Sequence, residues 1–311
     1  MKEVNFLFLI ISGKVYVDGM AIGSLRAEPH ARLDLVTAFK PHPRVQGVRK
    51  EIPYVPASSW VGVLRHLLEK HYGLQAQTLR IRRRPGATIV APLHECSSMD
   101  DILKCPVCKI FARRDIVAWF DDFEPLGSSY RIERGAKGGE YVINSDIDNN
   151  IVQVFVKDEV IVPRDIKSIA VPRDIARSQL GLRDIDKDVT GEDLIRRGLR
   201  LEPIPRQVQL VSGIFKFTAK FVMNKLVFDD LKPFFVGLVL LEDRYVGRRG
   251  TRGYGRVKFN DLAFSLRTRE FYEYGKAEIK IDIPHNKPRD IITNWDKIRK
   301  TYEQVIQNLA K

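Results

Sequence analysis

The sequence predicts an α+β fold, in which strands and helices alternate along the chain. Three apolar or alternating runs predict strands, at residues 4–17, 212–222 and 256–259. Two amphipathic runs predict helices, at residues 60–72 and 229–245. The elements therefore follow one another as strand, helix, strand, helix and strand.

Individual residues support each of these elements. Phe6, Phe8 and Ile10 would face the buried side of the first strand. A serine, Ser58 or Ser59, would cap the first helix. The inward stripe of that helix is expected to consist of Val61, Leu64, Leu67 and Leu68. The apolar positions of the second helix are Leu231, Phe234, Phe235, Leu238 and Leu241.

The composition favours a polyanion partner. The chain has 311 residues, 44% of them hydrophobic, and its formal net charge is +13. An excess of this size attracts nucleic acid, although many stable intracellular proteins are basic without a specific site. No apolar run reaches the roughly 20 residues of a membrane span, and residues 4–11 lack the features of a signal peptide. Three cysteines are too few for a disulfide framework, so we expect a soluble cytoplasmic protein.

The densest concentration of positive charge and backbone freedom lies at residues 246–259, which read V-G-R-R-G-T-R-G-Y-G-R-V-K-F. Glycines allow the backbone to approach a ligand closely, and arginine forks suit phosphate oxygens. We interpret this segment, called the glycine loop below, as one that grips an RNA backbone, with Tyr254 stacking on a base. A flexible basic turn is the alternative. The candidate RNA-binding residues here are Arg248, Arg249, Gly250, Arg252, Gly253, Tyr254, Gly255 and Arg256.

All three cysteines fall in one segment with a histidine, and the set consists of His94, Cys96, Cys105 and Cys108. Four ligands of this kind are enough for a closed tetrahedral zinc site, which leaves no position for a water nucleophile. The zinc would therefore be structural. Free buried thiols or a redox pair are the alternatives.

Several other segments carry local signals. Residues 23–51 read as a long surface loop, and residues 121–124 as a short acidic turn that is solvated or binds a metal. A basic run of Arg80, Arg82, Arg83 and Arg84 is either a solvated edge or an RNA contact. Residues 149–209 contain V-P-R-D-I twice and read as an extended, partly hairpin insertion. A strand is expected at residues 277–283 and an amphipathic helix at residues 294–309.

Taken together, these motifs resemble the RAMP superfamily, specifically the repeated backbone subunit of type III CRISPR effector complexes. Residues 53–60 resemble its P-Y-I-P-G-S-S stretch, and residues 247–259 its G-G-x-x-S-R-G-Y-G-K-V-K-F loop. Residues 20–23 are similar to its first glycine turn, residues 105–112 to its C-x-x-C-x-x-F-G stretch, and residues 146–148 to its I-D-R turn. The motifs occur in the family's order and span most of the chain.

The resemblance implies a ferredoxin-like, RNA-recognition-motif-like βαββαβ core. It implies a single domain over residues 1–311, with a zinc-bearing helical insertion at about residues 80–125 and a thumb-like hairpin insertion at about residues 149–210, and then a C-terminal helix at about residues 290–311. Some members hold zinc through three cysteines and a histidine. The implied partners are a CRISPR guide RNA, a target RNA, further copies or paralogues, and other subunits of the complex. Further candidates for RNA binding are Ser58, Ser59 and Arg65.

The resemblance also implies target-RNA cleavage, through an aspartate after the first glycine turn. Asp34 lies about where the family places this residue. Cleavage would need a divalent metal such as Mg²⁺ and the RNA 2′-hydroxyl as nucleophile. The chain departs from the pattern, because the proline-rich I-D-x-P-V sequence is missing and Ala57 replaces the typical glycine. Asp34 is therefore either a catalyst or a structural residue of a loop that only binds.

Three functions follow from these residues. The first is a guide-RNA-binding backbone subunit with endoribonuclease activity on paired target RNA, and the second is the same subunit without catalysis. The third is a stand-alone endoribonuclease that processes repeat RNA, which would use a histidine as general base. The available histidines, none beside an evident tyrosine or serine partner, are His30, His42, His66, His71 and His285.

Overall fold

The computed structural model describes residues 7–21, 33–35, 37–75, 78–84, 87–111, 117–161, 170–171, 189–190, 196, 204–247 and 253–309. Within that part of the chain, no helix is long and apolar enough to cross a membrane.

The elements up to the middle of the chain are β1 (Leu7–Met20), β2 (Leu33–Leu35), β3 (Phe39–Pro41), β4 (Val45–Gly47), β5 (Glu51–Pro53), α1 (Ala57–His71), β6 (Thr78–Arg84), β7 (Ala87–Leu93), α2 (Met99–Lys104), α3 (Cys108–Phe111), β8 (Ala118–Phe120), β9 (Glu124–Pro125), β10 (Tyr130–Arg134), β11 (Tyr141–Ser145) and β12 (Ile151–Ile161). They are followed by β13 (Ala170–Val171), β14 (Val189–Thr190), β15 (Ile204–Val222), the 3-10 helix η1 (Phe228–Leu231), α7 (Lys232–Glu242), β16 (Arg256–Thr268), α8 (Arg269–Tyr274), β17 (Ile279–Ile281), α9 (Pro288–Thr293) and α10 (Trp295–Leu309).

The centre of the protein is an antiparallel sheet in which β1 lies between β15 and β16. β8 and β9 pair with the far edge of β15, also antiparallel, so the core order is β16, β1, β15 and β8. α1 lies between β1 and β8 in sequence, and α7 lies between β15 and β16. This order and these directions are consistent with the ferredoxin-like core that the sequence predicts.

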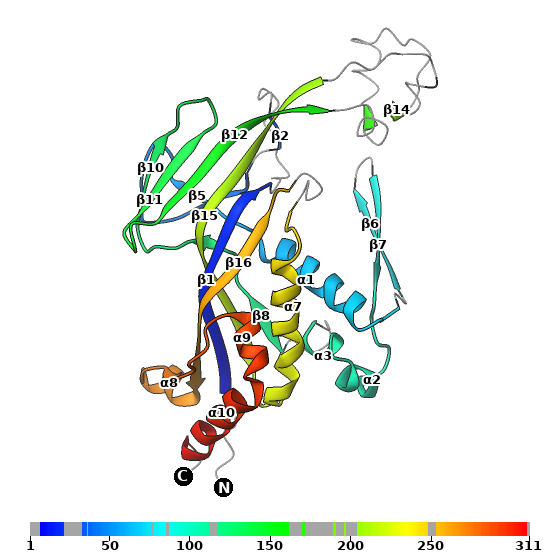
Figure 1. The fold of residues 1–311 in the computed structure, drawn as a ribbon, viewed down its shortest axis with the longest axis vertical. Coiled ribbons are helices and arrows are strands. Elements are labelled where there is room, and N and C mark those ends of the chain that lie inside the picture. Colours follow the sequence, from blue (N-terminus) through cyan, green and yellow to red (C-terminus); the bar gives the residue numbers. More distant parts are fainter. Residues whose placement is uncertain are drawn as a thin grey trace.

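One face of this sheet is covered by α1, α7 and α9, as Figure 1 shows. The aromatic side chains of the sheet and helices pack against one another there. The rings of Trp60 and Phe123 stack with their centroids 4.9 Å apart, and Phe221 meets Phe234 edge-on at 5.1 Å. α1 buries Trp60, Leu64 and Leu68, close to the predicted stripe. Burial of so many large apolar groups is the main stabilisation of this core.

A second part of the sheet extends away from the helices (Figure 1). β15 is long enough to pair with β1 over its last part and with β12 over its first part. β12, β11 and β10 then form an antiparallel meander that ends on β4, and β2 runs parallel to β15. β12 and β15 form the base of the insertion expected at residues 149–209. Residues 162–169, 172–188, 191–195 and 197–203 of that insertion lie outside the described part of the chain.

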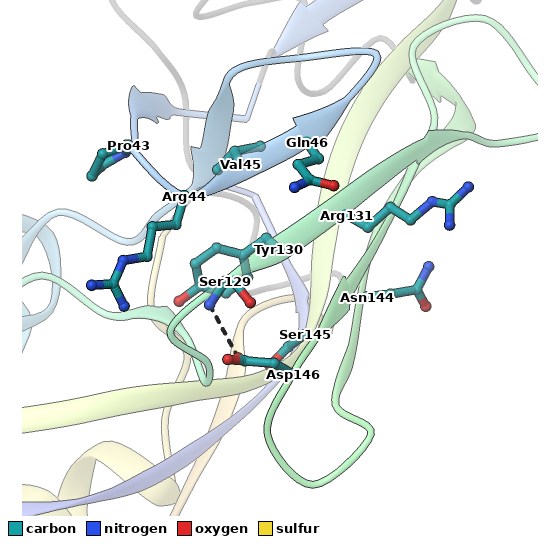
Figure 2. Close-up of a pocket in the computed structure, with 10 residues that line it drawn as sticks. All are labelled: Pro43, Arg44, Val45, Gln46, Ser129, Tyr130, Arg131, Asn144, Ser145 and Asp146. Carbon is teal, nitrogen blue, oxygen red and sulfur yellow. Dashed lines mark hydrogen bonds between the residues drawn. The ribbon is translucent and has the colours of Figure 1, made fainter.

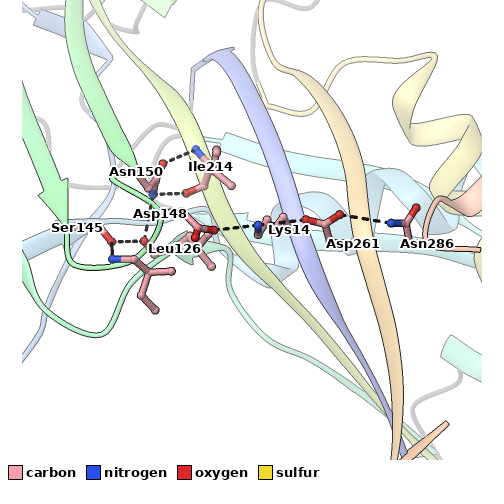
Figure 3. A network of polar contacts seen from close by, with 9 residues as sticks. Lys14, Leu126, Ser145, Asp148, Asn150, Ile214, Asp261 and Asn286 are labelled. Carbon is pink, nitrogen blue, oxygen red and sulfur yellow. Dashed lines mark hydrogen bonds and ion pairs between the residues drawn. The ribbon is translucent and has the colours of Figure 1, made fainter. Parts of the chain in front are cut away.

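A line of polar contacts ties the two parts of the sheet together, as Figure 3 shows. Lys14 on β1 bridges Asp148 of the β11–β12 turn at 2.9 Å and Asp261 of β16 at 3.1 Å. Beside it, the buried side chain of Asn150 donates to the carbonyl oxygens of Leu126 and Ile214. The meander is therefore held in a fixed position relative to the core strands.

Two local expectations were wrong. Neither Ser58 nor Ser59 caps α1, because the helix already begins at Ala57. Its first amide is instead bound by the Asp122 carboxylate, 2.8 Å away, so the acidic turn closes a helix end and is not a free solvated surface. The expected surface loop at residues 23–51 contains four short strands, β2, β3, β4 and the start of β5.

Candidate functional site

The structure brings the four predicted metal ligands together. His94 directly follows β7, Cys96 lies two residues later, Cys105 ends α2 and Cys108 begins α3. One ligand atom from each residue lies within 4.8 Å of the others. His94, Cys105 and Cys108 are buried and Cys96 is half-buried, so the cluster is largely shielded from water.

The donor set fits zinc. The Nε2 atom of His94 lies 3.3 Å from the sulfur of Cys96 and 3.5 Å from that of Cys105. A tetrahedral zinc, with Zn–S of about 2.3 Å and Zn–N of about 2.0 Å, sets nitrogen and sulfur ligands about 3.5 Å apart. The other ring nitrogen, Nδ1, lies 3.0 Å from the Gln75 carbonyl oxygen. Such a hydrogen bond fixes a histidine ring so that Nε2 is free to bind a metal.

The thiols differ in acidity because they share hydrogen bonds. The hydrogen bond with Cys108 lowers the pKa of Cys105 to about 4, and the same contact raises the pKa of Cys108. Burial raises the pKa of Cys96. The thiolate is the form that binds a metal, so metal binding would displace the thiol protons of the cluster.

Arg65 holds this cluster from α1. Its guanidinium donates to the His94 carbonyl oxygen at 2.5 Å, to the Phe111 carbonyl oxygen at 3.2 Å and to the Glu69 carboxylate at 2.9 Å. The Arg65 side chain is only 12% exposed. Three of the five guanidinium N–H donors of Arg65 are therefore used within the protein, and its RNA contact stays a prediction. Ser58 is exposed and Ser59 is half-buried in the first turn of the same helix.

The glycine loop is closed at its base by backbone contacts. The amide of Val246 donates to the Gly255 carbonyl oxygen at 2.8 Å, and the amide of Gly255 reaches the carbonyl oxygens of Asp18 and Gly19 at the end of β1. Gly255 has φ of +83°, and a Cβ there would lie 2.0 Å from the Val246 carbonyl oxygen. A glycine is therefore required at this position, and the loop is fixed against the first glycine turn.

Tyr254 lies half-buried in a small apolar cluster built from segments far apart in the sequence. The buried members are Ala21, Val208 and Leu210, and Phe155 packs against them. The ammonium of Lys157 lies 4.9 Å from the centre of the Tyr254 ring. The ring therefore packs within the protein and interacts with a cation, a role beyond the base stacking that the sequence predicts.

One exposed cation, Lys157, contacts this cluster, and two others follow Tyr254 along the chain. Lys157 of β12, Arg256 and Lys258 of β16 are all exposed, and Arg256 pairs with Asp18 in the register of β1 and β16. Gly253 has φ of +82°, and a Cβ there would meet no atom of the described residues within 4 Å. Four of the predicted RNA-binding residues lie outside the described part of the chain, namely Arg248, Arg249, Gly250 and Arg252.

The candidate catalyst Asp34 is the middle residue of β2. This strand runs parallel to β15, with Leu33 opposite Gln207 and Leu35 opposite Val208. Val208 belongs to the cluster around Tyr254, so the strand of Asp34 lies beside the part of β15 that supports the glycine loop. The structure describes the backbone of Asp34 but not its side chain.

A pocket of about 600 Å³ lies elsewhere, between β4, β10 and β11 (Figure 2). Its lining includes Arg44, Arg131 and Asp146, and none of the predicted site residues. Asp146 accepts hydrogen bonds from Ser128 and Ser129, which lower its pKa below the ordinary range. In the family-like turn at residues 146–148, this aspartate therefore fixes the loop that precedes β10.

Sequence reasoning missed two contributors to these sites. Lys157 was not distinguished from other surface lysines, because its partner Tyr254 is distant in the sequence. Gln75 contributes only a carbonyl oxygen, which no side-chain pattern reveals. The positive charge of Lys157 in the strand that precedes the insertion was the only feature of the sequence that could have indicated its role.

A family profile and two curated relatives connect this chain to known proteins. A profile of the RAMP superfamily matches residues 36–258. The CRISPR system Cms endoribonuclease Csm3 of Methanocaldococcus jannaschii is 27% identical over 246 residues, which cover 78% of this chain and 77% of that protein. The protein of the same name from Methanothermobacter thermautotrophicus is 36% identical over 70 residues, 22% of this chain and 29% of that protein.

Two solved structures are also similar. One is the Csm3-Csm4 subcomplex of the type III-A CRISPR-Cas interference complex, at 18% identity and a TM-score of 0.43, covering 94% of this chain and 96% of that chain. The other is the type III-B Cmr-beta complex bound to cognate target RNA, at 13% identity and a TM-score of 0.43, covering 83% of this chain and 60% of that chain.

Proposed function

Because this chain belongs to the RAMP superfamily, we propose that it is a guide-RNA-binding backbone subunit of a type III CRISPR ribonucleoprotein in antiviral defence. The relative from Methanocaldococcus jannaschii is named as a CRISPR endoribonuclease, and the two chains match over most of their lengths. Its partners would be guide RNA, target RNA, further copies or paralogues, and other subunits of the complex.

One observation carries this proposal: the glycine loop contacts both the first glycine turn and the base of the insertion. Ala21, Tyr254 and Val208 come from these three segments and pack in one cluster. Exposed cations lie next to it, and the whole chain carries a net charge of +13. Backbone amides and cations at one end of a sheet suit the phosphates of a single strand.

The proposed domain organisation is one RAMP domain with insertions. The zinc-bearing insertion, at about residues 80–125, would take its fold from zinc held by His94, Cys96, Cys105 and Cys108. The thumb-like insertion, at about residues 149–210, would extend from the β12–β15 base. The C-terminal helix, at about residues 290–311, would pack on the core through α10.

Endoribonuclease activity on guide-paired target RNA is a further part of the proposal. Asp34 would supply a carboxylate to a divalent ion such as Mg²⁺, which proteins often hold with one or two carboxylates and the phosphates of the substrate. That ion would neutralise charge at the scissile phosphate. The protein would hold the 2′-hydroxyl and the phosphate in line, and the strand of Asp34 beside Val208 supports such a position.

The proposal separates binding from cutting. In a reconstituted complex, Asp34→Ala should abolish cleavage of target RNA and leave guide binding intact, whereas Arg252→Ala should weaken guide binding or assembly. If the wild-type complex protects RNA and never cuts it, the chain is a scaffold subunit without catalytic activity. Specific cutting of repeat RNA by the isolated chain would instead identify a processing enzyme.

A further inference from the structure

Hairpin β6–β7 has an unusual charge composition. Residues 78–93 contain Arg80, Arg82, Arg83 and Arg84, and they contain no aspartate or glutamate. The two strands pair only with each other among the described strands, and Figure 1 shows the hairpin standing beside the helices, apart from the main sheet. A segment whose sequence carries four arginines and no acidic residue is suited to a polyanion.

The strand register determines which of these arginine positions share a face of the hairpin. Arg80 pairs with Ala91, Arg82 with Ile89 and Arg84 with Ala87. Alternate positions of a strand share one face, so positions 80, 82 and 84 share a face and position 83 belongs to the other. Along a strand, alternate residues lie about 6.5 Å apart. This spacing is close to that of successive phosphates in an extended single strand of nucleic acid.

The metal cluster closes the base of the same hairpin. The chain enters β6 shortly after Gln75 and leaves β7 directly at His94, and these two residues are joined by the 3.0 Å contact between the Gln75 carbonyl oxygen and Nδ1. Arg65 holds the His94 carbonyl oxygen from α1. An isolated two-stranded hairpin is marginally stable in water, so a fixed base is what gives this one a defined direction.

We propose that hairpin β6–β7 is a phosphate-binding arm for single-stranded RNA, and that the His94 cluster fixes the arm to the body of the protein. The inference rests on the proposed RNA-binding function and adds a second binding element to the glycine loop. The arm reads no sequence, because arginine contacts to phosphates carry no base information.

Counterion release gives the arm a measurable signature. Each phosphate that a cation neutralises adds about 0.7 to the slope of log K against log salt for a single strand. The variant Arg80→Gln/Arg82→Gln/Arg84→Gln should therefore flatten the slope by about 2. A matched control, Arg269→Gln/Lys276→Gln/Lys297→Gln, removes the same charge from exposed positions on α8, α10 and the segment between them. It should leave the slope near its wild-type value.

The experiment measures binding of a labelled single-stranded RNA of guide length to the full chain by fluorescence anisotropy over a range of KCl concentrations. The variant Arg80→Lys/Arg82→Lys/Arg84→Lys keeps the charge and should keep the slope, which separates lost charge from lost folding. Treatment of the wild type with a zinc chelator should flatten the slope as the glutamine variant does, and should change the slope of that variant no further.

Three outcomes would overturn the inference. The glutamine variant could bind RNA with the wild-type slope, or the matched control could lose as much as the variant does. The glutamine variant could also lose association between protein copies while its RNA affinity stays unchanged, which would make the arm a protein contact. If the wild type bound no RNA, the proposed function would fail together with this inference.

Discussion

The guanidinium of Arg65 donates a hydrogen bond of 2.5 Å to the carbonyl oxygen of His94. This contact joins the first helix of the core to a ligand of the candidate zinc centre. Because the same guanidinium also donates to the carbonyl oxygen of Phe111 at the end of α3, one side chain of α1 joins this helix to the cluster and to α3. The stability of the core and the occupancy of the metal site should therefore depend on each other.

The first prediction concerns this unit. Arg65→Met leaves the Glu69 carboxylate buried without its partner, and the loss of one member of a buried pair costs about 3 kcal/mol. We expect the free energy of unfolding in urea to fall by about that amount and the affinity for zinc to fall as well.

A matched control is available on the surface. Arg269 and Glu273 form a similar pair four residues apart on α8, and the Arg269 side chain is 72% exposed. Arg269→Met should lower the free energy of unfolding much less than Arg65→Met does, because exposed ion pairs contribute little to stability. Equal losses for the two variants would contradict the role given to Arg65.

The second prediction concerns the metal. Native mass spectrometry of the purified chain should find one zinc ion per chain, and Cys108→Ser should lower this occupancy and the Tm. Zinc removal by a chelator should have the same effect on the Tm, because a structural zinc contributes directly to folding. Glu95→Gln changes a residue between two ligands and should retain zinc. A fully loaded Cys108→Ser chain would contradict the assigned ligand set.

The clustering of His94 with the three cysteines and the order of the core elements could be predicted from the sequence, because their signals are local. The spacing of Cys105 and Cys108 alone predicts a pair of ligands, and the alternation at residues 212–222 predicts the C-terminal part of β15. The role of Arg65 could not be predicted, since its carbonyl partners at His94 and Phe111 lie 29 and 46 residues away. Every residue has a backbone carbonyl oxygen, so the residue type does not show which of these oxygens accepts a hydrogen bond.

The third prediction concerns the glycine loop. Gly255→Ala would place a methyl group 2.0 Å from the Val246 carbonyl oxygen, so the base of the loop must open. We expect a loss of about 2 to 4 kcal/mol in the free energy of unfolding and weaker RNA binding. Gly253→Ala meets no atom of the described residues, so its positive φ should be the main cost, about 1 to 2 kcal/mol. A Gly255→Ala chain as stable as the Gly253→Ala chain would refute the closed base.

The fourth prediction concerns pH. The hydrogen bond from Trp295 Nε1, 2.7 Å long, together with Arg299, lowers the pKa of Asp229. A lowered pKa in the folded state stabilises the protein above the ordinary aspartate value of about 3.9, and this contribution is lost as the pH falls through the lowered value. The stability difference between the wild type and Asp229→Asn should therefore be constant near neutrality and shrink below about pH 4.

Urea unfolding at a series of pH values measures this difference. Asp296 also pairs with Arg299, at 3.5 Å, but its side chain is 83% exposed. Asp296→Asn is therefore the exposed control, and it should change the free energy of unfolding at neutral pH less than Asp229→Asn does. A difference for Asp229→Asn that persists unchanged into acid would remove Asp229 from the pH dependence.

The beginning of α1 shows where local signals mislead. Two serines precede Trp60 and suggest a capped helix, yet the helix starts at Ala57 because Asp122, 65 residues away, binds its first amide. The extension of the sheet by β10, β11 and β12 was also not anticipated as a unit, since β10 and β11 are short and join the sheet only through β12, which pairs with β15. In both cases a distant partner decides the local structure.

The central claim is that this chain binds along a guide RNA as a repeated subunit. The most direct test counts the copies bound to single-stranded RNAs of increasing length, by native mass spectrometry with electron microscopy of the same particles. The proposal predicts that copies are added in proportion to RNA length and form a regular helical stack. One copy per RNA at every length, with specific cutting of repeat RNA by the chain alone, would contradict it.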